Sequence, residues 1–178
     1  YENIGDLKFT TKSMNWGNFS LNDCQDITFG LVPESVLSTQ STAAVQHAGN
    51  TLALWDPDKN GIYDLIIGHV GCPGFIFMKN EGTRNKPKFR NADYNFPAGV
   101  PHTVPSLASG SPIDLDGDGF LDLIASSHLP DLNPALETAS YYRSENGALV
   151  LKTKAFLQEE MIDVGDNASP VFFDVEGD

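Results

Sequence analysis

The chain has 178 residues, enough for one domain with a hydrophobic core, and its formal net charge of −13 makes nucleic acid and anionic membrane surfaces poor partners, because like charges repel. Hydrophobic residues make up 40% of the chain, alongside 16 Gly and 11 Pro, so we expect a folded, turn-rich protein instead of a disordered one. No apolar run is long enough for direct membrane insertion.

The first part of the chain carries a marker that returns later. The run Tyr1-Glu2-Asn3-Ile4-Gly5, followed by a Lys-Phe pair, resembles Met78-Lys79-Asn80-Glu81-Gly82, which a second Lys-Phe pair follows. A looser third copy lies at residues 142–147. From Asn3 to Asp56 there are 53 residues, against 34 from Asn80 to Asp114. We therefore expect an insertion within Asn22–Gly49, and it is our candidate contact region for a partner.

A second marker, an Asp-rich segment, occurs three times. The copies span Leu54–Gly68, Ser111–Ala125 and Ser169–Asp178, and their first Asp residues lie at 56, 114 and 174. The intervals of 58 and 60 residues indicate a repeat of about sixty residues, because both markers recur in the same order. The predicted units are roughly 1–49 (partial, with the insertion), 50–108, 109–168 and 169–178 (partial). Both ends of the chain fall inside this repeat, so we expect a segment of a longer protein.

Each unit is predicted to consist of β-strands. Short apolar runs at 52–55, 65–67 and 75–78 are separated by Gly, Pro, Asn and Asp, and no long helical periodicity lies between them. The sequence therefore predicts an all-β fold.

The Asp-rich segments have the spacing of a calcium loop. Oxygen side chains stand at positions 1, 3, 5 and 9, a glycine stands at position 6, and the carbonyl of position 7 can add a further ligand. The predicted ligands are Asp56, Asp58, Asn60, Ile62 and Asp64 in the first loop, Asp114, Asp116, Asp118, Phe120 and Asp122 in the second, and Asp174, Glu176 and Asp178 in a partial third. All-oxygen ligands in a flexible loop favour Ca²⁺ over Mg²⁺, and the absence of His and Cys disfavours zinc.

An EF-hand and a metal-free turn are the two alternatives to this prediction. An EF-hand needs a bidentate Glu at position 12, where this chain has Ile67 and Ala125. Asp-Gly turns without any metal remain an alternative. Two complete copies and a partial third favour the metal site.

These loops, between short strands and repeated about every sixty residues, resemble the FG-GAP/VCBS repeats of integrin-α-type propellers. The run Asn80–Phe89 is similar to the N-x-G-T-x-x-x-P-x-F segment of VCBS proteins of Bacteroidota. The resemblance implies consecutive blades of a β-propeller, each a four-stranded antiparallel sheet with calcium in the hairpin joining two strands, as a segment of a larger ring.

Other residues leave the function more open. Cys24 and Cys72 form either a disulfide or two buried free thiols. The histidines, at 47, 69, 102 and 128, follow no metal-ligand or catalytic spacing, so we expect no enzyme activity. Trp16, Trp55, Tyr141 and Tyr142 form either a sugar-binding platform or strand packing.

The expected role is a calcium-binding module of a secreted or cell-surface protein that mediates protein–protein, adhesion or assembly contacts. Its partner is expected to be a macromolecule, either a protein or a surface glycan. One alternative is a lectin-like or accessory domain of a carbohydrate-active enzyme. Another is a purely structural spacer.

Overall fold

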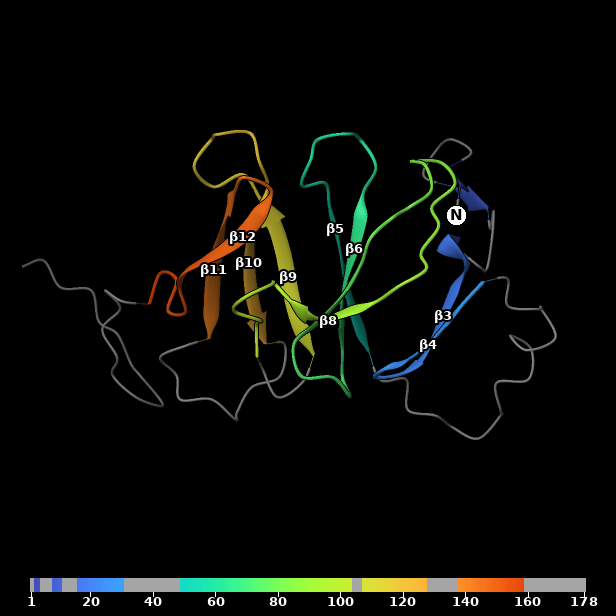
Figure 1. Ribbon diagram of the computed structural model, residues 1–178, viewed down its shortest axis with the longest axis horizontal. Coiled ribbons are helices and arrows are strands. Elements are labelled where there is room, and N and C mark those ends of the chain that lie inside the picture. The colour runs from blue at the N-terminus through green and yellow to red at the C-terminus, as the bar shows by residue number, and fades with distance from the viewer. Residues whose placement is uncertain are drawn as a thin grey trace, which may run out of the picture.

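The computed structural model describes residues 2–3, 8–10, 16–30, 49–103, 107–127 and 138–158, and the account below concerns these residues (Figure 1). They form an all-β, antiparallel fold with a single 3-10 turn, η1 (Trp16–Asn18). None of their helical segments is long and apolar enough to cross a membrane. The predicted fold class is thus confirmed at this level, and the described part of the chain shows no closed ring.

Two four-stranded sheets make up most of the fold, and in each the neighbouring strands are consecutive in the chain. Sheet 1 contains β5 (Asn50–Trp55), β6 (Asp64–His69), β7 (Phe75–Met78) and β8 (Asp93–Phe96). Sheet 2 contains β9 (Ala108–Ile113), β10 (Asp122–Ser127), β11 (Ala139–Glu145) and β12 (Ala148–Thr153). Two ribbons precede them, β1 (Glu2–Asn3) with β2 (Phe9–Thr10), and β3 (Phe19–Asp23) with β4 (Asp26–Phe29).

The two sheets repeat each other in register. In sheet 1, Leu65 of β6 pairs with Leu54 of β5 and with Met78 of β7. In sheet 2, Leu123 of β10 pairs with Pro112 of β9 and with Tyr142 of β11. Equivalent residues in the first two strands of the two sheets are therefore 58 residues apart in the chain, and equivalent residues in the third strands are 64 apart. The sequence repeat at Asp56 and Asp114 is thus a structural repeat, as is the looser marker copy at 142–147.

The hydrophobic core has two parts, one on each face of sheet 1. The face toward sheet 2 packs Trp55, Ile66 and Phe75 against Leu123 and Tyr142. The other face packs a group of buried residues against the β3–β4 ribbon: Leu65, Ile67, Ile76, Met78 and Phe89. Because sheet 1 is covered on both faces at β6, every residue of that strand is buried, whereas β11 of sheet 2 alternates between buried and half-buried residues.

The two sheets are in close contact where β5 and β6 meet β9. The Thr51 hydroxyl donates a hydrogen bond to the Ala108 carbonyl, and the Gly68 N–H donates to the Thr51 hydroxyl over 3.1 Å. A Cβ atom at Gly68 would overlap the Ala108 carbonyl oxygen. Glycine is therefore required at this position to let the two backbones meet.

Cys24 and Cys72 form a disulfide that joins the β3–β4 turn to the β6–β7 turn, with their Cα atoms 5.2 Å apart. A disulfide is typical of proteins in an oxidising compartment. Residues 22–29 of the predicted insertion complete the β3–β4 hairpin, which the disulfide ties to sheet 1. The remainder of the predicted insertion, 31–48, lies outside the described residues.

Candidate metal centre

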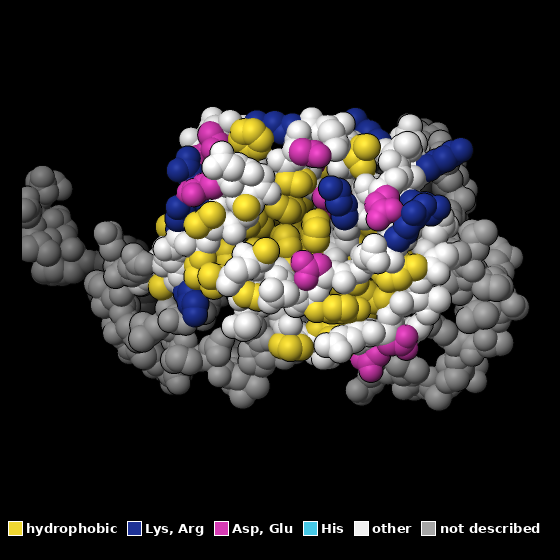
Figure 2. All heavy atoms as spheres, in the orientation of Figure 1, with side chains coloured by type: hydrophobic (Ala, Val, Ile, Leu, Met, Phe, Trp, Pro, Cys, Tyr) yellow, Lys and Arg dark blue, Asp and Glu magenta, His cyan; other side chains and the backbone are white. Residues whose placement is uncertain are grey.

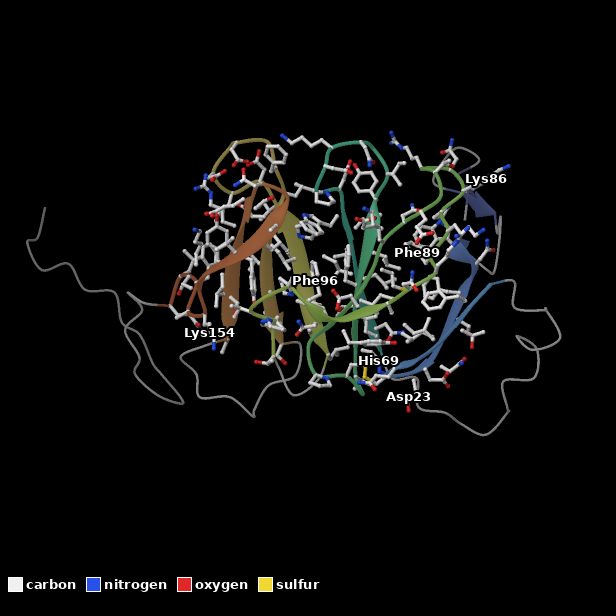
Figure 3. The ribbon with its side chains drawn as sticks, in the orientation of Figure 1. Asp23, His69, Lys86, Phe89, Phe96 and Lys154 are labelled. Atoms are coloured by element: carbon white, nitrogen blue, oxygen red, sulfur yellow. A yellow bond between two sulfur atoms is a disulfide. The ribbon has the colours of Figure 1, made fainter. Side chains whose placement is uncertain are left out.

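The two complete Asp-rich loops lie side by side at one edge of the molecule (Figure 1, top). The first loop (residues 56–64) connects β5 to β6, and the second loop (residues 114–122) connects β9 to β10. The Lys59 ammonium group of the first loop lies 3.5 Å above the centre of the Phe120 ring in the second. The disulfide lies at the opposite edge, near the labelled His69 and Asp23 (Figure 3).

The first loop folds around the side chains of its predicted ligands. Asp56 accepts hydrogen bonds from the N–H groups of Asn60 (3.1 Å) and Gly61 (2.8 Å). The Asn60 side-chain oxygen accepts from the Ile62 N–H over 2.6 Å. Gly61 takes a φ of 78°, a left-handed conformation that glycine adopts without strain. The loop is thus closed by local contacts, with Asp58 and Asn60 exposed to solvent.

The second loop repeats this geometry. Asp114 accepts from the Gly119 N–H over 2.9 Å, as Asp56 does from Gly61, and Gly119 has a φ of 84°. The Asp118 carboxylate accepts from the Phe120 N–H over 2.8 Å, as Asn60 does from Ile62. Two sequences that differ at several positions therefore fold into the same loop, because the Asp at position 1, the oxygen side chain at position 5 and the glycine at position 6 are retained.

The second loop brings three carboxylates together. Oxygen atoms of Asp114, Asp116 and Asp118 all lie within 4.8 Å of one another, at the surface. Carboxylates at this spacing repel one another unless a cation lies between them, and an all-oxygen set suits a hard cation. The Asp114, Asp116 and Asp118 group could therefore hold a metal ion. In the first loop Asn60 stands in place of the third carboxylate.

The ninth-position residues have a structural role that the sequence did not reveal. Asp64 is 5% exposed, and its carboxylate accepts a hydrogen bond from the Asn80 N–H over 2.8 Å. Asp122 is fully buried and accepts from the Ser144 N–H over 2.8 Å in the same way. The Asp122 carboxylate thus joins its loop to β11, the third strand of its sheet, and the Asp64 carboxylate joins its loop to Asn80, just after β7. Burial raises the pKa of Asp64, since the charged form loses hydration.

Asp122 has two further donors that Asp64 lacks among the described residues. The Tyr141 hydroxyl donates to it over 2.9 Å, and the Leu115 N–H donates over 3.3 Å. Burial, followed by the hydrogen bond and charge of Asp122, raises the pKa of Tyr141 to about 12. The Tyr141 hydroxyl therefore remains protonated and a donor throughout the neutral range.

Arg143 on β11 contacts the second loop directly. Its Nη2 atom lies 2.5 Å from Asp116 Oδ2 and 3.7 Å from Asp118 Oδ2. Sequence reasoning missed this contact. The sequence does contain a signal for it. In both repeats a basic residue directly precedes the residue whose N–H donates to the ninth-position Asp: Lys79 precedes Asn80, and Arg143 precedes Ser144.

The other predicted site residues have different outcomes. Asp174, Glu176 and Asp178 lie outside the described residues, as do His47 and His128. His69 and His102 are buried. Of the aromatic residues weighed as a sugar platform, Trp55 and Tyr142 lie in the core, Tyr141 bonds to Asp122, and Trp16 is half exposed. The structure therefore does not bring these four side chains together on one surface.

Comparison of the chain with family models, curated proteins and solved structures gave no significant match. The resemblance to FG-GAP/VCBS repeats therefore rests on the residues of the loops and markers, and it stays a prediction.

Proposed function

We propose that this protein is a calcium-binding module of a secreted or cell-surface protein. Its two sheets are consecutive blades of a β-propeller, and each Asp-rich loop holds one Ca²⁺. The module presents its loops to a macromolecular partner, a protein or a surface glycan, and performs no turnover itself. The disulfide supports an extracellular location, because such bonds persist in oxidising surroundings.

The observation that carries this proposal is the clustering of Asp114, Asp116 and Asp118 in a loop whose fold the first loop repeats. The donors are all oxygen atoms, which fits calcium, and the loops are exposed, which gives an ion access. Both loops connect the first two strands of a sheet, so a bound ion would stiffen that hairpin. A rigid scaffold with ordered loops suits recognition of another macromolecule.

Calcium is expected to stabilise the protein. With an affinity of about 0.1 mM, in the range of extracellular modules, about 1 mM calcium adds roughly 1.4 kcal/mol per site to the free energy of unfolding. Thermal melts in calcium and in chelator, combined with calorimetric titration, measure this effect and the number of sites. Identical melts together with no heat of binding would contradict the proposal.

Asp58→Ala and Asp116→Ala are the variants of choice, each expected to abolish one site and leave the other. Both residues belong to the loops and not to the buried contacts with the third strand. Asp64 and Asp122 are unsuitable, because their loss would destabilise the sheets with or without calcium. Asp26→Ala, the same charge change at the exposed start of β4, is the matched control and should retain both sites.

A further inference from the structure

The two loops differ in charge although they share one fold. The first loop has Asp56 and Asp58 at its surface, with the neutral Asn60, whereas the second has Asp114, Asp116 and Asp118. The buried ninth-position Asp is common to both. The second loop therefore has one carboxylate more than the first, and it has no counterpart of Lys59, the basic residue of the first loop.

Arg143 compensates for this additional carboxylate. Its guanidinium contacts Asp116 and Asp118, so the exposed acidic groups of the second loop and Arg143 together carry a formal charge of −2, the same as Asp56 and Asp58 together. The equivalent residue beside the first loop is Lys79, which is exposed. Within the described residues no ion pair joins Lys79 to Asp56 or Asp58.

The ion pair is arranged so that it can be replaced. Only Nη2 of Arg143 contacts the carboxylates, and its enclosed Nε has no acceptor among the described residues. The guanidinium is therefore not held by the two parallel bonds that make an arginine–carboxylate pair strong. Both partners are also partly open to water, where such a pair contributes little.

We propose, building on the calcium sites proposed above, that Arg143 is an internal competitor of Ca²⁺ at the second loop. In the absence of calcium, Arg143 binds Asp116 and Asp118 and offsets the repulsion among the three carboxylates. Calcium displaces Arg143, because the carboxylate oxygens of Asp116 and Asp118 cannot coordinate the ion and pair with the guanidinium at the same time. The second loop thus stays ordered without calcium and binds it less tightly than its three carboxylates alone would allow.

The test is calcium titration of the whole 178-residue chain with Arg143→Gln. A site-specific readout is available in Trp55, whose indole N–H donates to the Leu121 carbonyl over 3.0 Å, next to Asp122. The chain has two tryptophans, so a Trp16→Phe background leaves Trp55 as the only one. Because Trp55 also directly precedes Asp56 of the first loop, the fluorescence titration is done with Asp58→Ala, which removes the first site, so that the signal follows the second loop. Calorimetry without Asp58→Ala reports both sites. The expected result is calcium affinity about fivefold tighter at the second loop, with the first unchanged.

Lys152→Gln is the matched control. It removes the same charge from the same sheet, but Lys152 pairs with Glu145 and not with the loop. It therefore corrects for the general gain in cation affinity when a positive charge is removed from an acidic protein. In chelator, Arg143→Gln should melt below Lys152→Gln, and in saturating calcium the two should melt together. This second measurement detects the competition even where the titration curves are shallow.

The outcomes separate this inference from the proposed function. Calcium binding by the wild-type chain, with equal or weaker binding by Arg143→Gln, would overturn the role of Arg143 and leave the calcium sites standing. Binding at the second loop only after Arg143→Gln would support the inference strongly. The absence of binding in both proteins would overturn the two proposals together.

Discussion

His102 is a titratable residue buried between the two sheets. Its ring stacks on Phe75 of sheet 1 with 5.3 Å between centroids and meets Tyr142 of sheet 2 edge-on at 6.4 Å. It is 5% exposed, and its Nε2 has no hydrogen-bond partner among the described residues. Burial lowers the pKa of His102 to about 4, with a smaller contribution from Lys154 and an opposing one from a backbone hydrogen bond to Ser126.

This environment predicts acid sensitivity of the packing between the sheets. The unfolded chain binds a proton at His102 below a pH of about 6.5, whereas the folded protein resists protonation down to about 4. The stability is therefore greatest above pH 6.5 and falls as the pH is lowered toward 4, by up to roughly 3 kcal/mol. Urea denaturation at a series of pH values measures this loss.

The His102→Phe variant separates this effect from the titration of carboxylates in the same range. Phenylalanine retains a ring between Phe75 and Tyr142 but cannot take up a proton. The wild-type protein should lose more stability than the variant between pH 6.5 and 4. Parallel curves for the two proteins would show that His102 does not cause the loss.

At the residue scale, the sequence predicted the loop ligands from their spacing, but it did not predict that these ligands have different structural roles. Asp56 and Asp64 look alike in the sequence, yet Asp56 closes its loop whereas Asp64 is buried against the Asn80 N–H. That difference depends on the third strand, which returns to the loop only after the chain has folded. The Arg143 contact depends on the same long-range packing, so local spacing could not reveal it.

At the scale of elements, the β3–β4 hairpin depends on two kinds of contact with sheet 1. Phe19 of β3 packs edge-on against Phe89 with 5.5 Å between ring centroids, and the Cys24–Cys72 disulfide closes the far end. The two cysteines are 48 residues apart in the chain. A crosslink over that distance removes much of the conformational freedom of the unfolded state.

Removing the disulfide should loosen this hairpin. The double variant Cys24→Ala/Cys72→Ala is expected to lower the free energy of unfolding by about 2–5 kcal/mol. Hydrogen exchange should show the largest loss of protection at β3 and β4, because the hairpin would then lack its covalent link to sheet 1 and depend on the packing of its apolar side chains, Phe19, Leu21, Ile27 and Phe29. An unchanged exchange pattern, or loss spread evenly over both sheets, would contradict a local role for the bond.

The strands could be predicted where a local pattern of apolar and turn residues is enough to define a strand. The apolar runs at 52–55, 65–67 and 75–78 became β5, β6 and β7, because each is short and bounded by turn residues. The hairpin at 19–29 was not predicted, since most of it lies within the predicted insertion, which begins at Asn22 and for which no strands were expected. The sequence could not decide between a disulfide and two free thiols for a similar reason, because two cysteines pair only if the fold brings their turns together.

At the scale of the whole molecule, the two sheets pack head to tail. Ala53, Ile66 and Phe77 of sheet 1 point toward sheet 2. Their repeat equivalents point to the side of sheet 2 that faces away: Ser111, Ile124 and Tyr141. The opposite face of sheet 1 shows the same incompleteness, since Leu52 and Leu54 of β5 are 68% and 47% exposed. Packing of this kind does not close on itself and leaves complementary faces at both ends.

These exposed faces contribute to the surface of the molecule. Ile113 and Val150 of sheet 2 are 43% and 37% exposed. On the side shown in Figure 2, hydrophobic side chains gather below the mixed acidic and basic groups of the loop edge. In the proposed propeller the end faces would be covered by neighbouring blades. In the isolated chain, another copy of the chain can cover these faces of the described sheets.

The isolated 178-residue chain is therefore expected to self-associate head to tail, with the outer face of sheet 2 in one copy against Leu52 and Leu54 of the next. Analytical ultracentrifugation over a range of concentrations should show growing oligomers instead of a single monomer. Ile113→Glu and Leu52→Glu should each reduce association, because a charge on an apolar interface must be desolvated. Tyr94→Glu, on the far edge of sheet 1 from β5, should not.

Mixing the two charged variants gives the sharpest result. A head-to-tail contact needs one intact face from each copy, and each variant retains the face that the other has lost. The mixture should therefore form dimers and stop there, while each variant alone stays monomeric. If both variants alone still form oligomers, or if the mixture grows beyond dimers, the exposed faces do not pair in this way. A wild-type chain that is monomeric at every concentration would show that these faces need no cover.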